Sequence, residues 1–390
     1  MFKLHKLSFL PILATIISSD FSVGQIINAV PQEVYRYCYV VETKEWYRNQ
    51  QKLWQQKLKN NPRNENAWYN YFFAARYGWA DIQGQTNTRE ALMDSIFKEM
   101  SKAIPNSWVY HYIHYYNYGT DFSRLEKAYQ INPHEPDLYW EFIKEYTLTG
   151  QKAKRHEFCK KLYESKDIST GIYNLNFNML NSASENSVLF TNGDNDTYPA
   201  WILQDVKSIR PDILILTIHG IFSNRDYLKS TLLDRGIKID IEKLSREDVF
   251  VFFHSLMELL HIAYPTTAIH IARTVYPPYY EKFKDKLNLT GIVFTYSENH
   301  FNSYEIHRDL MEQKLSLDYL AYDWYDELHV SQQLVNQLNL IYIEPFIKLA
   351  EYHRKHDNNS VAKKWLNEAL VLARKVNDEA AINKISKMID

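Results

Sequence analysis

The chain has 390 residues, of which 45% are hydrophobic and 24% are charged, and its formal net charge is −2. This length predicts about two domains. The near balance of charges argues against nucleic acid or another polyanion as a partner, because such ligands need a basic surplus. The only two cysteines, Cys38 and Cys159, could pair in an oxidising compartment. Two buried free thiols are the equal alternative.

The first 24 residues have the pattern of a cleavable secretory signal peptide. A basic start in residues 1–6 is followed by an apolar run in residues 7–17, and Ser22 and Gly24 put small residues before a cut at Gln25. The apolar run is shorter than the roughly 20 residues that a membrane span needs. We therefore expect a periplasmic, extracellular or outer-membrane-associated protein with no transmembrane span in its mature form. A buried N-terminal helix is the alternative.

Residues 25–180 and 301–390 show helical spacing of apolar residues, punctuated by prolines that end one helix before the next begins. A small residue, a proline and an aromatic residue follow one another in an order that resembles the tetratricopeptide repeat (Ala128, Pro133, Tyr139). A second match lies near the C-terminus (Ala362, Leu366, Ala369). The resemblance implies helical hairpins that stack side by side. Generic helical hairpins without this repeat are the alternative.

Residues 181–300 change to short β-rich runs that alternate with helices. Four runs predict strands, at residues 187–191, 213–217, 268–272 and 291–296. Three segments predict helices: residues 199–209 with Pro199 in the first turn, residues 245–263 with Ser245 as N-cap, and residues 279–287. The alternation predicts parallel pairing, and the apolar strands predict a sheet covered on both faces. The expected fold class is therefore α/β plus all-α, with tetratricopeptide-like hairpins flanking a three-layer α/β domain whose sheet is mainly parallel.

One loop of this middle segment carries a candidate site. Its polar side chains lie between the end of a predicted strand and a predicted helix, where ligands bind in open α/β sheets (Asn192, Asp194, Asn195, Asp196, Thr197). Asp194 and Asp196 are candidate ligands of a divalent cation such as Mg²⁺ or Ca²⁺. Trp201 and His219 are candidate neighbours in the same crevice. The alternative is structural, because Asp or Thr before a helix commonly caps it.

The motif from Val188 to Trp201, together with residues 203–213, resembles a family found chiefly in Bacteroidetes. Its typical members are multi-spanning membrane proteins that resemble protein O-mannosyltransferases and carry a soluble C-terminal region. The resemblance continues in residues 268–275 and 287–294 and covers roughly residues 170–300. It implies a soluble domain of the bacteroidete cell envelope. It does not imply glycosyl transfer, because that chemistry belongs to the family's membrane helices and we expect no transmembrane span in the mature chain. The basic-Pro pair that usually precedes the later strand is also absent.

Two functions stay open on the sequence. The first is an exported scaffold or binding protein of the cell envelope, accessory to a larger assembly and with protein partners, since helical repeats form surfaces that hold peptides or proteins. The second is a sugar- or metal-binding module, or an enzyme, that uses Asp194 and Asp196. His254, Glu258 and His261 share one helix face, but packing is the favoured interpretation on so apolar a helix. Without a Gly-rich phosphate loop or a Gly-x-Ser-x-Gly motif, enzyme activity stays undecided.

Overall fold

The computed structural model describes residues 30–79, 86–119, 121–299, 301–322 and 329–389, with the side chains of residues 86–88 left aside. The predicted signal peptide, residues 1–24, lies outside the described residues. Two compact units divide the chain, and their described parts are residues 30–142 and 143–389. The sequence predicts a helical domain that reaches residue 180, whereas this division places residues 143–180 with the sheet.

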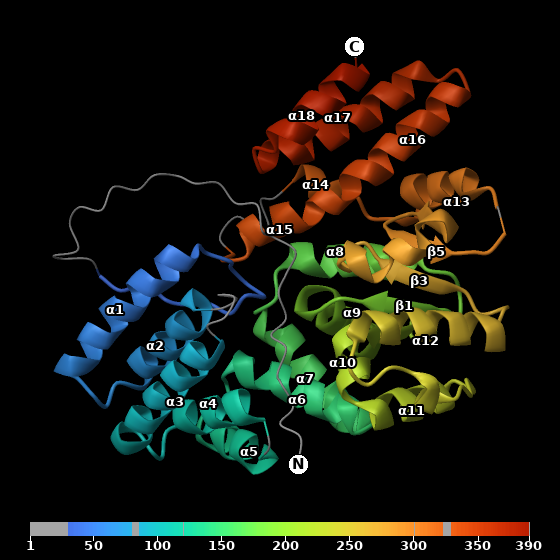
Figure 1. Ribbon diagram of the computed structural model, residues 1–390. Helices are drawn as coiled ribbons and strands as arrows, with labels where there is room; N and C mark the ends of the chain where they lie inside the picture. Colours follow the sequence, from blue (N-terminus) through green and yellow to red (C-terminus); the bar gives the residue numbers. More distant parts are fainter. Residues whose placement is uncertain (1–29, 80–85, 120, 300, 323–328, 390) are drawn as a thin grey trace. The chain divides into compact units, whose positions relative to one another are not determined.

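The first unit is built of helices, which begin at well-defined caps. The side chains of Thr43 and Asn64 accept the backbone N–H groups of Trp46 and Ala67, and so satisfy donors that the first turn leaves unpaired. The core between the helices is aromatic, with Tyr47, Phe72, Phe73, Tyr112 and Trp140 fully buried. The helices are α1 Lys44–Asn60, α2 Glu65–Gly78, α3 Thr86–Ala103, α4 Trp108–Tyr118, α5 Phe122–Ile131 and α6 Pro136–Leu148, whose last turn belongs to the second unit (Figure 1).

The second unit combines one small sheet with helices before, between and after its strands (Figure 1). The helices that precede or connect the strands are α7 Lys152–Ser165, α8 Thr170–Ser182, α9 Asp194–Lys207, α10 Ile218–Ser223, α11 Arg225–Asp234 and α12 Val249–Ala263. The helices that follow the sheet are α13 Ser303–Asp309, α14 Asp318–Ala321, α15 Gln332–Leu338, α16 Ile343–Lys355, α17 Asn359–Lys375 and α18 Glu379–Ile389. Short 3₁₀ turns are η1 Ile241–Lys243, η2 Pro277–Tyr279, η3 Glu281–Lys286 and η5 Asn339–Tyr342, and η4 Leu310–Lys314 is a π turn.

The sheet has five strands in the order β2-β1-β3-β5-β4. Its strands are β1 Val188–Thr191, β2 Leu214–Thr217, β3 Ile269–Ala272, β4 Leu287–Thr290 and β5 Val293–Tyr296. β1 pairs in parallel with β2 and β3, as predicted, and Phe190 of β1 contacts Phe253 of α12 ring to ring. The prediction of parallel pairing is wrong for β5, which runs antiparallel to both β3 and β4. The sheet is therefore mixed.

The unpredicted strand β4 exists because of a tight hairpin. Thr290 pairs with Val293, so only Gly291 and Ile292 form the connection. Gly291 has φ +57, in the left-handed region that favours glycine, and a Cβ atom there would lie 2.2 Å from Ser182 Oγ. The sequence prediction of a helix over residues 279–287 is wrong because this stretch is split into 3₁₀ turns, and Leu287 already belongs to β4.

Two helix starts also differ from the prediction. The helix expected from Pro199 begins five residues earlier, at Asp194, and Pro199 lies inside it. The helix expected from Ser245 begins at Val249, where Asp248 is the N-cap and accepts the backbone N–H groups of Phe250 and Val251. Ser245 instead accepts the N–H groups of Glu247 and Asp248 in the preceding turn. Ser245 and Asp248 are both residue types that cap helices, and the side chain of Asp248 makes the cap.

Candidate functional site

The acidic loop follows β1, the strand that has β2 on one side and β3 on the other. The chain leaves β1 for β2 on one side and later returns to β3 on the other side of β1. In open α/β sheets, the carboxyl ends of two such strands flank the usual ligand crevice. Asn192–Asp196 follow β1, and Arg273 and Thr274 follow β3. The sequence therefore placed this loop at the correct edge of the sheet.

Asp196 binds backbone and hydroxyl groups of the fold itself. Its two carboxylate oxygens accept the N–H groups of Asn192, at 2.8 Å, and Gly193, at 2.7 Å. They also accept the hydroxyl of Thr274, which follows β3. Asp196 is only 3% exposed, and burial raises the pKa of its carboxyl, while these hydrogen bonds act in the opposite direction. At the third position of α9, the carboxylate completes half of a capping box and faces the positive end of the helix dipole.

The neighbouring loop residues extend this structural role. Thr197 Oγ1 lies 2.7 Å from Thr191 Oγ1, which joins the first turn of α9 to the last residue of β1. The backbone carbonyl of Asn195 accepts a hydrogen bond from the Asn176 side chain of α8 at 2.7 Å. Asn192 and Asp194 are partly exposed. The structure thus brings Asn192, Asp196 and Thr197 together.

The other two candidate residues have partners elsewhere. Trp201 is 5% exposed and contacts the ring of Tyr198 edge to face. His219 follows β2 in α10, and its Nε2 atom lies 3.0 Å from the hydroxyl of Tyr279. Burial lowers the pKa of His219. Sequence reasoning missed Thr274, although its place directly after a strand gave the signal.

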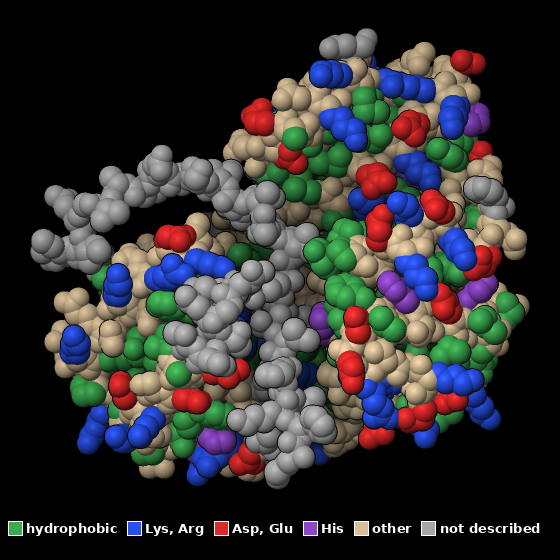
Figure 2. All heavy atoms as spheres, viewed as in Figure 1, with side chains coloured by type: hydrophobic (Ala, Val, Ile, Leu, Met, Phe, Trp, Pro, Cys, Tyr) green, Lys and Arg blue, Asp and Glu red, His purple; other side chains and the backbone are tan. Residues whose placement is uncertain are grey.

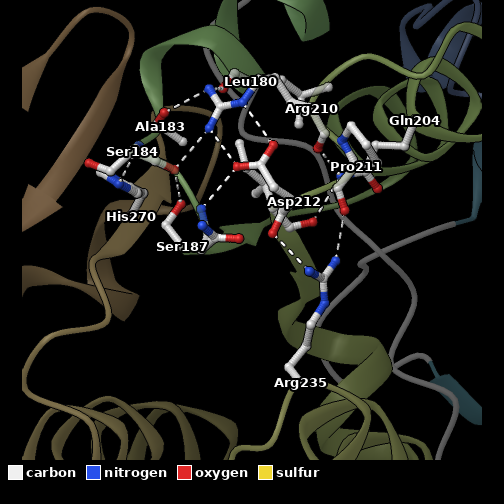
Figure 3. Close-up of polar contacts among 12 residues, drawn as sticks. Leu180, Ala183, Ser184, Ser187, Gln204, Arg210, Pro211, Asp212, Arg235 and His270 are labelled. Atoms are coloured by element: carbon white, nitrogen blue, oxygen red, sulfur yellow. Dashed lines mark hydrogen bonds and ion pairs between the residues drawn. The ribbon is translucent and has the colours of Figure 1, made fainter.

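A second polar cluster, at the opposite end of the strands, was not recognised as such from the sequence (Figure 3). Arg210 donates to both carboxylate oxygens of Asp212, and also to the carbonyls of Leu180, Ala183 and Ser184. These contacts tie the end of α8 to the residues before β2. The Arg210 guanidinium holds the pKa of Asp212 down, at about 2. The stretch Ile209–Ile213, which carries part of the family resemblance, therefore has a structural role.

An open groove lies at the edge of the sheet, between β4, α13, α16 and α18, with a volume of about 690 Å³. Its walls include Leu289, Ser303, Tyr304, Lys348, Lys384 and Ile385. Lys348 Nζ donates to the carbonyl of Leu289 at 2.9 Å and to Ser303 Oγ at 3.0 Å. Burial lowers the pKa of Lys348 to about 8, although Glu344 and Glu351 act in the opposite direction. Sequence reasoning missed this groove because its walls come from four separate elements.

The free side of β4 opens toward this groove. The N–H of Ser297 donates to the carbonyl of Lys286, so the main-chain groups of Lys286 face β5. By the strand register, the main-chain groups of Asn288 and Thr290 face β5 as well. Main-chain groups alternate in direction along a strand, so those of Leu287 and Leu289 face away from β5. The bond from Lys348 to the Leu289 carbonyl agrees with this alternation. The groove therefore borders an edge strand whose outer face has no strand partner in the described sheet.

Other candidate ligands form no metal cluster. Within the described ranges, no three His, Cys, Asp or Glu side chains lie close enough together to hold a metal ion. His254 contacts the carbonyl of Tyr279, Glu258 pairs with Lys282, and His261 packs on a tyrosine ring. Cys38 and Cys159 are buried in different compact units, and no disulfide joins these described residues. The packing interpretation of the histidines fits these contacts.

The comparisons with known proteins point to the same part of the chain. The model of the family TMEM260-associated domain 2 matches residues 172–231, which run from α8 through β1, α9, β2 and α10 into α11. This family is linked to TMEM260, a proposed protein O-mannosyltransferase. The match includes the acidic loop and the Arg210 cluster. No curated protein matches the chain. Over the stretches of chain that the structure describes, no helix has both the length and the apolar character needed to cross a bilayer.

Proposed function

We propose that this chain is a scaffold or binding protein of the cell envelope, accessory to a larger envelope assembly. The groove beside β4 is its binding surface in the second unit. The observation that carries the proposal is the ammonium group of Lys348, which is partly buried at the groove with only uncharged hydrogen-bond acceptors. The pattern of residues 1–24 supports export, and the proline-punctuated helices support tetratricopeptide-like hairpins.

The charge on Lys348 indicates the chemistry of the partner. The ammonium has three protons, and two of them go to Leu289 and Ser303. Among the described residues, no carboxylate lies close enough to Lys348 to form an ion pair. A carboxylate from a partner would supply that missing charge, and burial would make the bond stronger than at an open surface. Lys384 also lines this groove and adds a second cation, while Glu344 and Glu351 line it too, so the position of the Lys348 ammonium and not a net positive charge of the groove would select the partner.

The edge strand indicates the shape of the partner. An exposed strand edge binds an extended peptide through main-chain hydrogen bonds, and side-chain pockets then select its sequence. Leu289 faces the groove with its main-chain groups, and Ile385 offers an apolar wall. Figure 2 shows Lys, Arg, Asp and Glu side chains interspersed over the C-terminal helices on the face in view, so no patch of one sign covers this face. We therefore propose an extended segment with an acidic residue as the partner.

The contacts of the acidic loop favour a structural role of this loop over a catalytic one. Asp196 uses its carboxylate to hold the start of α9 and to join it to Thr274. A sugar- or metal-binding module, or an enzyme, that uses the Asp194/Asp196 loop is the second candidate. It is favoured by one observation, namely that Asp194 is partly exposed at the strand crossover where ligands bind in α/β sheets.

Fluorescence anisotropy with two labelled peptides tests the first candidate. One peptide alternates Asp and Val, and the other alternates Lys and Val. We expect the acidic peptide to bind, and Lys348→Met to weaken it at least about tenfold, the usual cost of losing a charge-assisted bond. Lys363→Met, at an exposed position of α17 outside the groove, is the matched control. Equal binding by both peptides, or no effect of Lys348→Met, would contradict the proposal.

Calorimetry with Ca²⁺, Mg²⁺ and nucleotide sugars tests the second candidate on wild type and Asp194→Ala. Heat of binding that disappears in Asp194→Ala, with an unchanged unfolding temperature, would establish a ligand site at this loop. If neither protein releases heat, the second candidate is removed.

A further inference from the structure

The first described residues run without regular secondary structure over residues 30–36 and then form a turn at residues 37–39, where the N–H groups of Tyr39 and Val40 donate to the Arg36 carbonyl. This N-terminal segment, residues 30–41, is held through its main chain by side chains of two helices. The N–H of Gln32 donates to Gln50 of α1 at 2.8 Å, and its carbonyl accepts from the Trp54 indole at 2.8 Å. The N–H of Val34 donates to the side-chain oxygen of Asn70 of α2 at 2.6 Å. Asn70 is fully buried, and its amide nitrogen is fixed by Asn66.

Alternate side chains of the segment enter the unit. Val34, Arg36 and Cys38 are buried, while Tyr35 and Tyr37 between them are only partly so. This period of two over residues 34–38 is that of an extended strand, and it ends at Tyr39, which is buried too. Tyr37 stacks on the ring of Tyr77 of α2 with centroids 4.0 Å apart. Residues 30–36 therefore lie against α1 and α2 as an extended peptide, and the turn at residues 37–39 follows them.

Arg36 reaches an acidic pocket on a distant helix. Its guanidinium lies 3.4 Å from a carboxylate oxygen of Glu141 and 3.7 Å from one of Asp137, both on α6. It also lies 5.6 Å from the ring centre of Trp140, within cation–π range. The hydroxyl of Tyr69 donates to the other oxygen of Asp137. Arg36 is 7% exposed, so its charge is neutralised inside the unit.

These contacts have the form of peptide recognition. Side-chain amides that bind the main chain tolerate many sequences, whereas a buried acidic pocket selects one cation at a fixed position. We name the residues that receive the segment, Asn70, Tyr77, Asp137, Trp140 and Glu141, the acceptor face. It combines both kinds of contact, and it fits an extended peptide with an arginine two residues after an aliphatic side chain.

We propose that the acceptor face is a peptide-binding site which residues 30–41 occupy in cis, and that it takes a partner's extended, arginine-bearing segment when the cis segment leaves. This surface lies in the first unit, so it is independent of the groove at Lys348. The covalent link gives the cis segment an effective concentration on the order of millimolar. A free peptide at micromolar concentration therefore binds this site only after the link is cut or the cis segment is displaced.

The test cuts that link in the full chain. A protease recognition sequence is inserted between Val41 and Glu42, ahead of the Thr43 cap of α1. The probe is a fluorescein-labelled synthetic peptide of residues 30–41. We expect the uncut protein to bind the probe at least about tenfold more weakly than the cut protein, because the cis segment competes only while it is attached.

Two variant peptides test the acidic pocket. We expect Arg36→Gln in the probe to weaken binding at least about tenfold, and Arg36→Lys to restore part of it, because lysine keeps the charge but not the planar fork. Equal binding of the Arg36→Gln peptide would overturn the proposal. So would a cut protein that unfolds as the segment leaves, or one whose segment neither leaves nor exchanges with the probe, because residues 30–41 would then be part of the core. The acidic peptide for the Lys348 groove, measured on the same cut protein, separates this failure from failure of the proposed function.

Discussion

The side-chain amide of Asn176 donates to the backbone carbonyl of Asn195 at 2.7 Å. In a regular helix that carbonyl would receive the N–H of the residue four positions later, which is Pro199 and has none. Asn176 lies on α8 and is fully buried, so a side chain of one helix replaces a main-chain donor missing from the next. This explains how α9 continues through an interior proline.

A double-mutant cycle tests this replacement. Asn176→Ala should lower the free energy of unfolding by about 1–3 kcal/mol, because it leaves a buried carbonyl without its donor. In the Pro199→Ala background the same change should cost less, because the alanine N–H supplies the missing donor. Urea unfolding of the four proteins measures the coupling. An equal cost of Asn176→Ala in both backgrounds would show that the two residues do not act together.

Asp196→Asn tests the structural role of the acidic loop. The amide keeps the shape of the carboxylate but only one accepting oxygen, so it cannot keep both the bond from Gly193, on one carboxylate oxygen, and the bonds from Asn192 and Thr274, on the other. We expect the free energy of unfolding to fall by about 1–3 kcal/mol. Asp194→Asn, at the partly exposed first position of α9, is the control and should change it by less than about 1 kcal/mol. The reverse order of the two effects would contradict a capping role for Asp196.

His270 should make the fold sensitive to mild acid. It is 1% exposed, its Nε2 atom accepts the N–H of Ser184, and its Nδ1–H faces Thr295 Oγ1. Burial lowers the pKa of His270 to about 3, and Arg210 adds to this effect. Because the folded pKa lies below the unfolded value near 6.5, the unfolded state binds the proton more strongly. The stability that the neutral His270 side chain contributes is fully present above about pH 6.5 and is lost as the pH falls toward 3.

The expected loss from this one side chain is about 1.4 kcal/mol per pH unit within that window. Thermal unfolding of wild type and His270→Gln from pH 7 to pH 4 measures it, since glutamine still accepts from Ser184 but does not titrate. The variant should have the shallower pH dependence. His134→Gln, at an exposed position, should leave the slope unchanged. Parallel curves for wild type and His270→Gln would exclude His270 as a source of acid sensitivity.

Gly291→Ala should destabilise the β4–β5 hairpin. The added methyl group would lie 2.2 Å from Ser182 Oγ, and this oxygen already accepts the N–H of Ile292. The left-handed φ adds roughly 1–2 kcal/mol of its own. Gly236→Ala, also at positive φ but with open space around its Cβ position, isolates that contribution. We expect Gly291→Ala to lower the unfolding temperature more than Gly236→Ala, and equal shifts would mean that the contact with Ser182 is not restrictive.

The sequence predicted those parts of the fold that depend on local pattern. Short apolar runs correctly indicated β1, β2 and β3, because a buried strand needs continuous apolar residues. β4 was missed because Leu287 and Asn288 continue a charged stretch, and because the hairpin is also held by the bond from the Ile292 N–H to Ser182, more than one hundred residues away. Non-local contacts of this kind leave no periodic signal.

The candidate site shows the same division. The strand–loop–helix pattern placed Asp196 at the correct sheet edge, but its acceptor bond from Thr274 joins residues 78 positions apart. Whether a carboxylate binds a ligand or the fold itself depends on such a partner, which local sequence does not reveal. Asp194 and Asp196 therefore stay a predicted cation site in the sequence, while the geometry assigns Asp196 a defined structural role.

The N-terminal segment also has a consequence for the order of folding. Arg36 contacts partners on α6 that lie 101 and 105 positions later in the chain. The chain is synthesised from its N-terminus, so Arg36 leaves the ribosome before Asp137 and Glu141. Until those residues have been synthesised, the Arg36 guanidinium is a solvated charge. Loop closure over such a distance is slow compared with helix formation. Arg36 thus leaves the ribosome early but reaches its native contacts late, and until α6 has folded the part of the acceptor face on α2, Asn70 and Tyr77, stays open to any nascent or neighbouring chain.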